Sequence, residues 1–144
     1  MTIQRMDHVG VVVDDLAAAK AFFVDLGLEV RGETAAEGDW VDRIVGLEGV
    51  RVDTAMVATP DGHGRLELIE FHSPPAQGGD AQPANTRGIR HIAFIVDDID
   101  AAVAGARARG AELVGEVERY EDMFRLCYLR GPAGIIVELA ERIG

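Results

Sequence analysis

The sequence predicts an α+β fold built from two copies of one βαβββ module. Three observations support this fold class: an internal repeat, short runs rich in β-branched residues, and alanine-rich stretches bounded by helix-capping signals. Residues 6–16 align with residues 89–99 without a gap, at a constant offset of 83 that matches His8 with His91. A repeat of this kind indicates one supersecondary unit that is used twice.

The second halves of the two copies also correspond. Residues 60–62 form a turn signal before a strand-like segment that contains Glu67, and residues 132–134 do the same before a segment that contains Glu138. The offset here is about a dozen residues smaller, so the first copy carries an insertion, which we place at residues 35–49. Each copy therefore begins with a histidine and ends with a glutamate at equivalent positions.

Periodicity and turn residues place the elements of each copy. Two helices are expected, each starting after an aspartate N-cap, Asp15 or Asp98, and closing at a glycine, Gly27 or Gly110. Strands are expected near residues 6–13, 28–34, 51–58 and 64–71 in the first copy, and near 89–96, 112–118, 123–130 and 134–140 in the second.

The chain is expected to form a single domain over residues 1–144. Module one covers residues 1–72 and module two covers residues 89–144. The segment 73–88 between them is rich in proline, glycine and small polar residues, which is typical of a linker.

Composition excludes several classes of function. The 144 residues are 48% hydrophobic, which is enough to build a core without disulfides, and Cys127, the one cysteine, is expected to be a small buried residue. No apolar run is long enough to span a bilayer and no signal segment opens the chain, so we expect a cytoplasmic protein with no membrane partner. A net charge of −11 argues against nucleic acid as a partner and leaves a small-molecule substrate.

The repeated histidines and glutamates predict a metal site. His8 shares a strand face with Gly10, and His91 shares one with Ala93, so each imidazole has open space beside it. Glu67 and Glu138 emerge among apolar neighbours, where an unpaired carboxylate would be costly. A divalent cation removes that cost, because two carboxylates and two neutral imidazoles form a mixed nitrogen and oxygen site of nearly balanced charge. The symmetry of the repeat is expected to bring one histidine and one glutamate from each module together.

These segments resemble a known family over nearly the whole chain. The HVGVVVDDL and HIAFIVDDID segments, the LEL and VEL strands and the turns before them are similar to the vicinal oxygen chelate superfamily, which comprises glyoxalases, bleomycin resistance proteins and dioxygenases. The glyoxalase and methylmalonyl-CoA epimerase members are most similar. The resemblance implies paired βαβββ modules that form a half-barrel metal-binding cleft, with the metal ligands at His8, Glu67, His91 and Glu138.

The resemblance also implies a reaction. A metal with one or two open positions, zinc, nickel, cobalt or manganese, would stabilise the enolate formed when a proton leaves the carbon next to a carbonyl. The expected activity is that of a glyoxalase-like lyase or an epimerase-like isomerase acting on a small molecule such as a thioester or a hemithioacetal. Glu138 is the first choice for the catalytic base and Glu67 the second. A homodimer is expected, and the four ligands could come from one chain or from two.

Three alternatives remain open at this stage. An antibiotic-binding protein of the bleomycin resistance type would keep the cleft without the metal. An extradiol-type dioxygenase would use two histidines and one glutamate for iron, and a fourth ligand at Glu67 argues against it. A fosfomycin-type transferase would share that three-ligand set and also bind a potassium ion, for which the sequence holds no clear signal.

Further residues have competing interpretations. Glu70 could replace Glu67 as a ligand, although strand alternation places it on the opposite face. His63 and His72 are expected in exposed loops. The segment from Glu37 to Gly49 could be a short lid. Six arginines are possible substrate anchors: Arg43, Arg51, Arg65, Arg119, Arg125 and Arg130.

Overall fold

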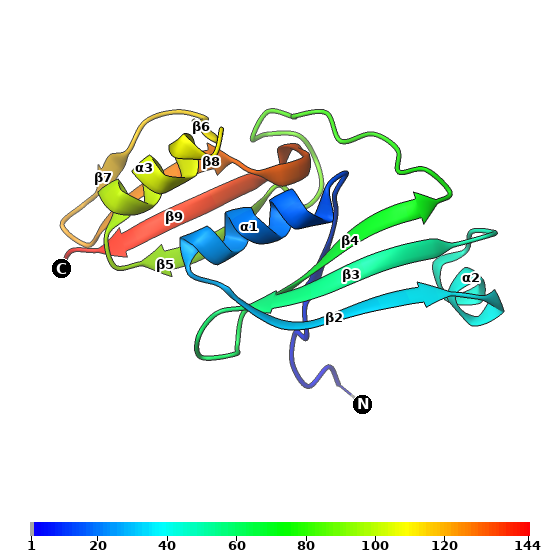
Figure 1. Cartoon of the computed structure of the whole chain (residues 1–144). Helices are drawn as coiled ribbons and strands as arrows, with labels where there is room; N and C mark the ends of the chain where they lie inside the picture. The colour runs from blue at the N-terminus through cyan, green and yellow to red at the C-terminus, as the bar shows by residue number, and fades with distance from the viewer. Residues whose placement is uncertain (1) are drawn as a thin grey trace. The chain divides into compact units, whose positions relative to one another are not determined.

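A computed structural model describes residues 2–144, which fold into two compact units that meet in sequence at Gly78 and Gly79. Each unit contains one sheet and one long helix (Figure 1). The first strand of the second unit lies in the repeated segment, which starts at residue 89. The predicted α+β class is therefore confirmed. None of the helices in the described part of the chain is long and apolar enough to cross a membrane.

The first unit has a four-stranded sheet in the order β1-β4-β3-β2. Strand β1 is parallel to β4, and the pairs β3 with β4 and β2 with β3 are antiparallel. Its elements are β1 (Val9–Val12), α1 (Leu16–Leu26), β2 (Glu29–Glu37), α2 (Asp39–Val45), β3 (Arg51–Ala58) and β4 (Arg65–Ser73).

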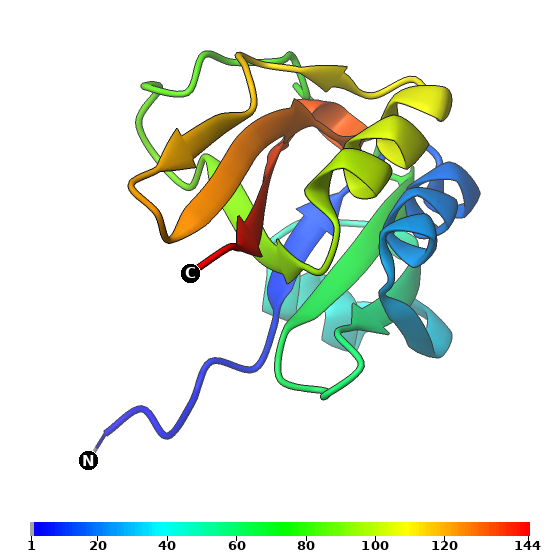
Figure 2. The ribbon, with the colours of Figure 1, turned by 90° about the vertical axis from the view of Figure 1, so that its left-hand side faces the viewer.

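The second unit repeats this topology in the order β5-β9-β8-β6, with β7 as an additional partner of β8. Strand β5 is again parallel to the last strand of its unit. Helix α3 lies against β8 and β9 (Figure 2). The elements are β5 (His91–Val96), α3 (Ile99–Ala108), β6 (Glu112–Leu113), β7 (Glu118–Tyr120), β8 (Phe124–Arg130), a short 3-10 turn (Pro132–Gly134) and β9 (Ile136–Arg142).

Both long helices begin in the same way. The side chains of Asp15 and Asp98 accept hydrogen bonds from the amides of Ala18 and Ala101, as predicted for N-caps. A glutamate from the last strand of each unit accepts a further amide: Leu16 N–H donates to Glu70 at 3.0 Å, and Ile99 N–H donates to Glu141 at 2.8 Å. These glutamates satisfy donors that would otherwise lack a partner in the first turn of a helix.

The face of each sheet that meets its helix carries the core. In the first unit Ala55, Val57 and Leu68 are fully buried with Phe23 of α1. In the second unit Leu129 and Leu139 are fully buried with Ile99 of α3. Cys127 is also buried, as expected, and burial raises the pKa of its thiol.

Two predicted elements were wrong in detail. The strand expected over residues 112–118 is two short strands, β6 and β7, because the chain bends away from β8 between them at a segment that contains Gly115. The insertion at residues 35–49 holds a helix, α2, that the sequence analysis did not predict.

Helix α2 is held by one apolar contact region. Val41 is buried with Val50 and Val52, and Ile69 and Phe71 of β4 pack against this group. Ile69 and Phe71 lie two and four residues after Glu67, and therefore on the same face of β4 as Glu67. Helix α2 of the insertion thus packs on the sheet face that carries Glu67.

Candidate metal centre

The first unit brings two of the four predicted ligands together. Glu67 on β4 is paired in register with Gly10 on β1, and His8 lies two residues before Gly10, directly ahead of the strand. The parallel pairing therefore puts both side chains on one face of the sheet. His8 Nε2 lies 3.9 Å from Glu67 Oε1, and both side chains are about one-third exposed, at 36% and 32%.

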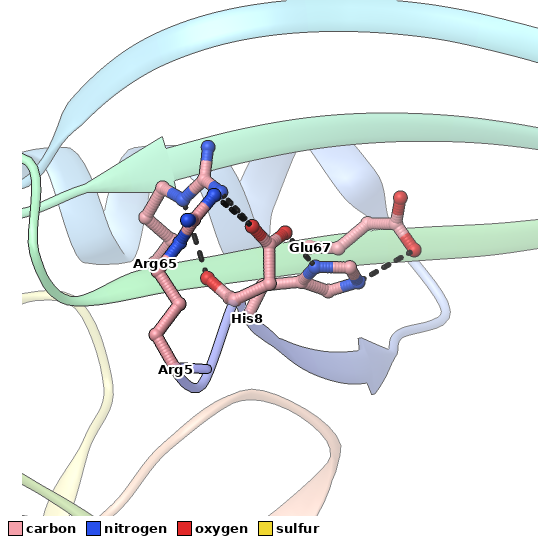
Figure 3. Close-up of polar contacts among 5 residues, drawn as sticks. Arg5, His8, Arg65 and Glu67 are labelled. Carbon is pink, nitrogen blue, oxygen red and sulfur yellow. Dashed lines mark hydrogen bonds and ion pairs between the residues drawn. The ribbon is translucent and has the colours of Figure 1, made fainter. Parts of the chain in front are cut away.

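A second contact fixes the other nitrogen of His8. Its Nδ1 lies 2.8 Å from Asp7 Oδ2, and Arg65 donates from Nη2 to Asp7 Oδ1 at 2.5 Å. Figure 3 shows Arg65 on one side of the His8 imidazole and Glu67 on the other. The hydrogen bond from His8 is the main cause of a lowered pKa at Asp7, to which Arg65 and Arg5 also contribute by their charge. A carboxylate on Nδ1 favours the tautomer whose Nε2 lone pair is free for a metal.

The second unit repeats the histidine and glutamate pair. Glu138 on β9 is paired in register with Ala93 on β5, and His91 lies two residues before Ala93. His91 Nε2 is 3.3 Å from Glu138 Oε1. Glu138 is the less exposed of the two glutamates, at 21%, and its neighbours on that face, Ile136 and Ala140, are both buried.

The Nδ1 atom of His91 has a different partner from the Nδ1 atom of His8. Tyr128 on β8 is paired in register with Glu138, and its hydroxyl lies 3.5 Å from His91 Nδ1. The two rings are 5.0 Å apart between centroids and tilted by 35°. In the second unit, therefore, a tyrosine hydroxyl and its aromatic ring lie beside the Nδ1 atom of the histidine. In the first unit the partner of Nδ1 is a carboxylate that is bound to arginine.

Each unit thus presents one imidazole nitrogen and one carboxylate from equivalent strand positions. Within each unit, the imidazole nitrogen and the carboxylate are donor types that zinc, nickel, cobalt and manganese accept in proteins. The donors fit a divalent ion by their chemistry, because in each unit Nε2 faces the carboxylate while Nδ1 has another partner.

Comparison with known proteins identifies the family. Residues 7–128 match the family model of the glyoxalase/bleomycin resistance protein/dioxygenase superfamily. The chain belongs to this superfamily. The vicinal oxygen chelate resemblance found in the sequence is therefore confirmed at the level of the superfamily.

Individual relatives extend over the whole chain. A glyoxalase family protein from Bacillus cereus has a crystal structure that matches with a TM-score of 0.96 and 44% identity, covering 100% of this chain and 97% of that one. The protein YaeR of Escherichia coli K12 is 29% identical over 142 residues, which are 97% of this chain and 98% of YaeR.

A more distant structure shares the fold. The fosfomycin resistance protein FosX from Listeria monocytogenes, crystallised with Mn(II) and 1S,2S-dihydroxypropylphosphonic acid, matches with a TM-score of 0.63 and 18% identity, covering 99% of this chain and 92% of that one.

Other predicted site residues of this superfamily member have separate roles. Glu70 lies on the helix-facing side of β4, as strand alternation predicted, and binds the amide of Leu16. His63 lies in an exposed loop, as expected. His72 was expected in a loop and instead lies within β4, where its Nε2 is 2.8 Å from Asp53 Oδ2. The loop prediction failed because β4 continues to Ser73, up to the prolines that follow.

Several arginines predicted as substrate anchors have partners in the protein. Arg65 binds Asp7, and Arg125 forms two hydrogen bonds to Asp100, at 2.9 and 3.0 Å. Arg130 donates to the backbone carbonyls of Gln82 and Gly134, both at 2.9 Å. These three side chains thus have hydrogen-bond partners within the protein, and their role as substrate anchors stays a prediction.

Two residues that contact the histidines, Asp7 and Tyr128, were not predicted from the sequence. Asp7 precedes His8 directly, and an acidic residue next to a ligand histidine is a signal that could have found it. Tyr128 required the register of β8 on β9, since it lies ten residues before Glu138 in sequence.

Proposed function

We propose that this chain is a metal-dependent lyase or isomerase that moves a proton next to a carbonyl group through an enolate. The ligands in this proposal are His8, Glu67, His91 and Glu138, and the ion is zinc, nickel, cobalt or manganese. The observation that carries the proposal is the equivalence of the two pairs. Each unit directs a histidine Nε2 toward a glutamate oxygen from the same strand positions, at 3.9 Å and 3.3 Å.

The bound ion would supply a positive charge that stabilises the negative oxygen of an enolate. The residues of the chain have to do the rest. Asp7 and Tyr128 orient the two imidazoles, and a glutamate accepts the proton from the substrate carbon.

Glu138 is the proposed base and Glu67 the alternative. Buried Ile136 and Ala140 flank Glu138 on its strand face, so its carboxylate has less access to water than that of Glu67. A shielded carboxylate can return the proton to the same carbon or to its neighbour before the proton exchanges with solvent. Such a return is what an epimerisation or an isomerisation requires.

The first experiment measures bound metal in the full chain, purified without a metal-affinity tag. We expect the unaltered chain to bind about one equivalent more than a His8→Ala/Glu138→Ala double variant. The loaded protein is then assayed for thioester epimerisation and hemithioacetal isomerisation, with each of the four metals. Equal metal content in the two proteins after reconstitution would refute the ligand assignment.

The base is tested separately. Glu138→Gln keeps the size and a possible oxygen ligand, and we expect kcat to fall by about 10² to 10⁴-fold with a much smaller change in KM. Glu67→Gln is the matched control and should lower kcat less. Equal turnover in Glu138→Gln and the unaltered protein would exclude Glu138 as the base.

The other candidate function is sequestration of an apolar antibiotic, as in the bleomycin resistance members of the superfamily. The observation that favours it is Ile95, which is 70% exposed on the same face of β5 as His91 and Ala93. Such a binder would need no metal, so the metal measurement separates the two functions. For either function we expect a homodimer, which analytical ultracentrifugation would test.

A further inference from the structure

A group of three side chains lies on the helix-facing side of the first unit's sheet. It consists of Asp53 on β3 with Glu70 and His72 on β4. His72 Nε2 is 2.8 Å from Asp53 Oδ2 and 3.4 Å from Glu70 Oε2. One ligand atom from each residue lies within 4.8 Å of the other two.

This triad, Asp53/Glu70/His72, is distinct from the pair formed by His8 and Glu67. Glu70 is three residues after Glu67, so strand alternation directs it to the opposite face. His72 lies at an irregularity in the pairing of β4 with β3, and its contacts with Asp53 and Glu70 place it on the side of Glu70. The hydrogen bond from Leu16 of α1 to Glu70 fixes that face as the one that meets the helix. The two groups of ligands are therefore on opposite sides of β4.

The second unit has a basic residue opposite the glutamate that caps its helix. There Glu141 is paired in register with Arg125, whose charge is further balanced by Asp100. In the first unit Glu70 is paired in register with Asp53, so a carboxylate stands where the second unit has a guanidinium. Like charges directly opposite each other on neighbouring strands are destabilising.

Among the described residues, neither lysine nor arginine relieves this repulsion. Within residues 2–144 neither Asp53 nor Glu70 forms an ion pair with lysine or arginine, and His72 is the only basic group bound to either of them. An imidazole carries no permanent charge, so the two opposed carboxylates have no fixed counterion among these contacts. A divalent cation would balance both of them and accept the imidazole nitrogen as a third ligand.

The geometry also suits one ion. Two ligands at metal distances near 2.1 Å and a tetrahedral angle are about 3.4 Å apart, which is the separation of His72 Nε2 from Glu70 Oε2. The 2.8 Å between His72 Nε2 and Asp53 Oδ2 is a hydrogen-bond distance, so these two atoms would move apart when an ion binds between them. Glu70 is braced, because its Oε1 accepts the Leu16 amide at 3.0 Å while Oε2 faces His72. A ligand held by a second hydrogen bond needs little rearrangement to bind a metal.

We propose that Asp53, Glu70 and His72 form a second divalent metal site, which links β3, β4 and the start of α1. The donor set of one imidazole and two carboxylates accepts zinc, cobalt or manganese, and three protein ligands leave positions for water. Because all three ligands belong to the first unit, the ion stabilises that unit whatever binds at His8 and His91.

The test uses Co(II) with the full chain carrying His8→Ala and His91→Ala, which removes two ligands of the proposed catalytic site. Calorimetric titration should give one equivalent of bound Co(II), with the visible absorption of coordinated cobalt. Adding His72→Ala should abolish binding, whereas adding His63→Ala should leave it unchanged, because His63 is an exposed loop histidine a short distance before β4. Co(II) should raise the unfolding temperature of the double variant and not that of the variant that also lacks His72.

A second variant guards against a folding defect. Asp53→Asn keeps the shape of the side chain and should also abolish Co(II) binding while circular dichroism stays unchanged. The proposal is overturned if the double variant binds no Co(II), or if binding survives both His72→Ala and Asp53→Asn. If the unaltered chain and the double variant each bind one equivalent, and this binding requires His72 in both, the catalytic site is refuted and the site at Asp53/Glu70/His72 is supported.

Discussion

At the scale of single residues, the orientation of His8 depends on its neighbour in sequence. Asp7 accepts from His8 Nδ1 at 2.8 Å and is itself held by Arg65. This arrangement leaves Nε2 facing Glu67, which is the nitrogen that our proposal assigns to the metal. Outer contacts of this kind contribute to affinity because they fix both the tautomer and the ring.

We therefore expect Asp7→Asn to weaken metal binding by about 10- to 100-fold. The amide keeps the size of the side chain but loses the charge that attracts Arg65 and stabilises the imidazole as a ligand. Competition titration with a metal-sensitive dye measures the dissociation constant. Asp122→Asn, at a fully exposed carboxylate that pairs with Arg119, is the control, and an unchanged constant in Asp7→Asn would mean that Asp7 does not orient the ligand.

Residue-level patterns predicted the metal-ligand candidates but not their supporting contacts. The repeat alone singled out His8, His91, Glu67 and Glu138, and the structure pairs them within each unit. Tyr128 and the triad of Asp53, Glu70 and His72 depend on strand register. A shift of one residue in register would move each of these side chains to the other face, so sequence alone could not place them.

At the scale of elements, the two aspartates directly before helix α1 have different roles. Asp15 caps α1 by accepting from Ala18 N–H at 3.0 Å, whereas Asp14 lies one residue earlier and is also exposed. A capping role and a role as a metal ligand would both be consistent with the sequence. The structure supports the first, since the Asp15 side chain already satisfies a helix amide.

We expect Asp15→Ala to lower the free energy of unfolding by about 1 kcal/mol, because one amide of the first helical turn loses its acceptor. Urea unfolding followed by circular dichroism measures the change. Asp14→Ala is a matched control at the adjacent position and should have little effect. Equal losses in the two variants would contradict the assignment of Asp15 as the cap.

Other elements could be predicted only where a local signal exists. Capping residues flank both long helices, and turns precede β4 and β9, the strands that carry Glu67 and Glu138. These four elements were all predicted from such signals. Helix α2 escaped prediction because it has a single buried residue, Val41, and leaves Trp40, Ile44 and Val45 exposed, so its apolar residues do not follow one buried face. Strands β6 and β7 were merged because the bend between them has no proline to mark it.

At the scale of the whole molecule, the two units repeat one topology, but their candidate ligands His8 and His91 have different surroundings. His8 is supported by a carboxylate and an arginine, and His91 by a tyrosine. Two identical half-sites would contribute equally to any function. The two candidate half-sites thus differ in the contacts of their histidines and in the exposure of their glutamates, of which Glu138 in the second unit is the more shielded.

The decisive property of the whole chain is whether its two His–Glu pairs bind one ion or two. If they share one ion, His8→Ala and His91→Ala should each remove the same full equivalent of catalytic metal, because a pair alone offers only two ligands. Elemental analysis measures this in chains that also carry His72→Ala, so that the triad does not contribute. Half of the metal retained in each single variant would mean two independent sites, and the enolate mechanism, which needs one fully ligated ion next to Glu138, would then lose its basis.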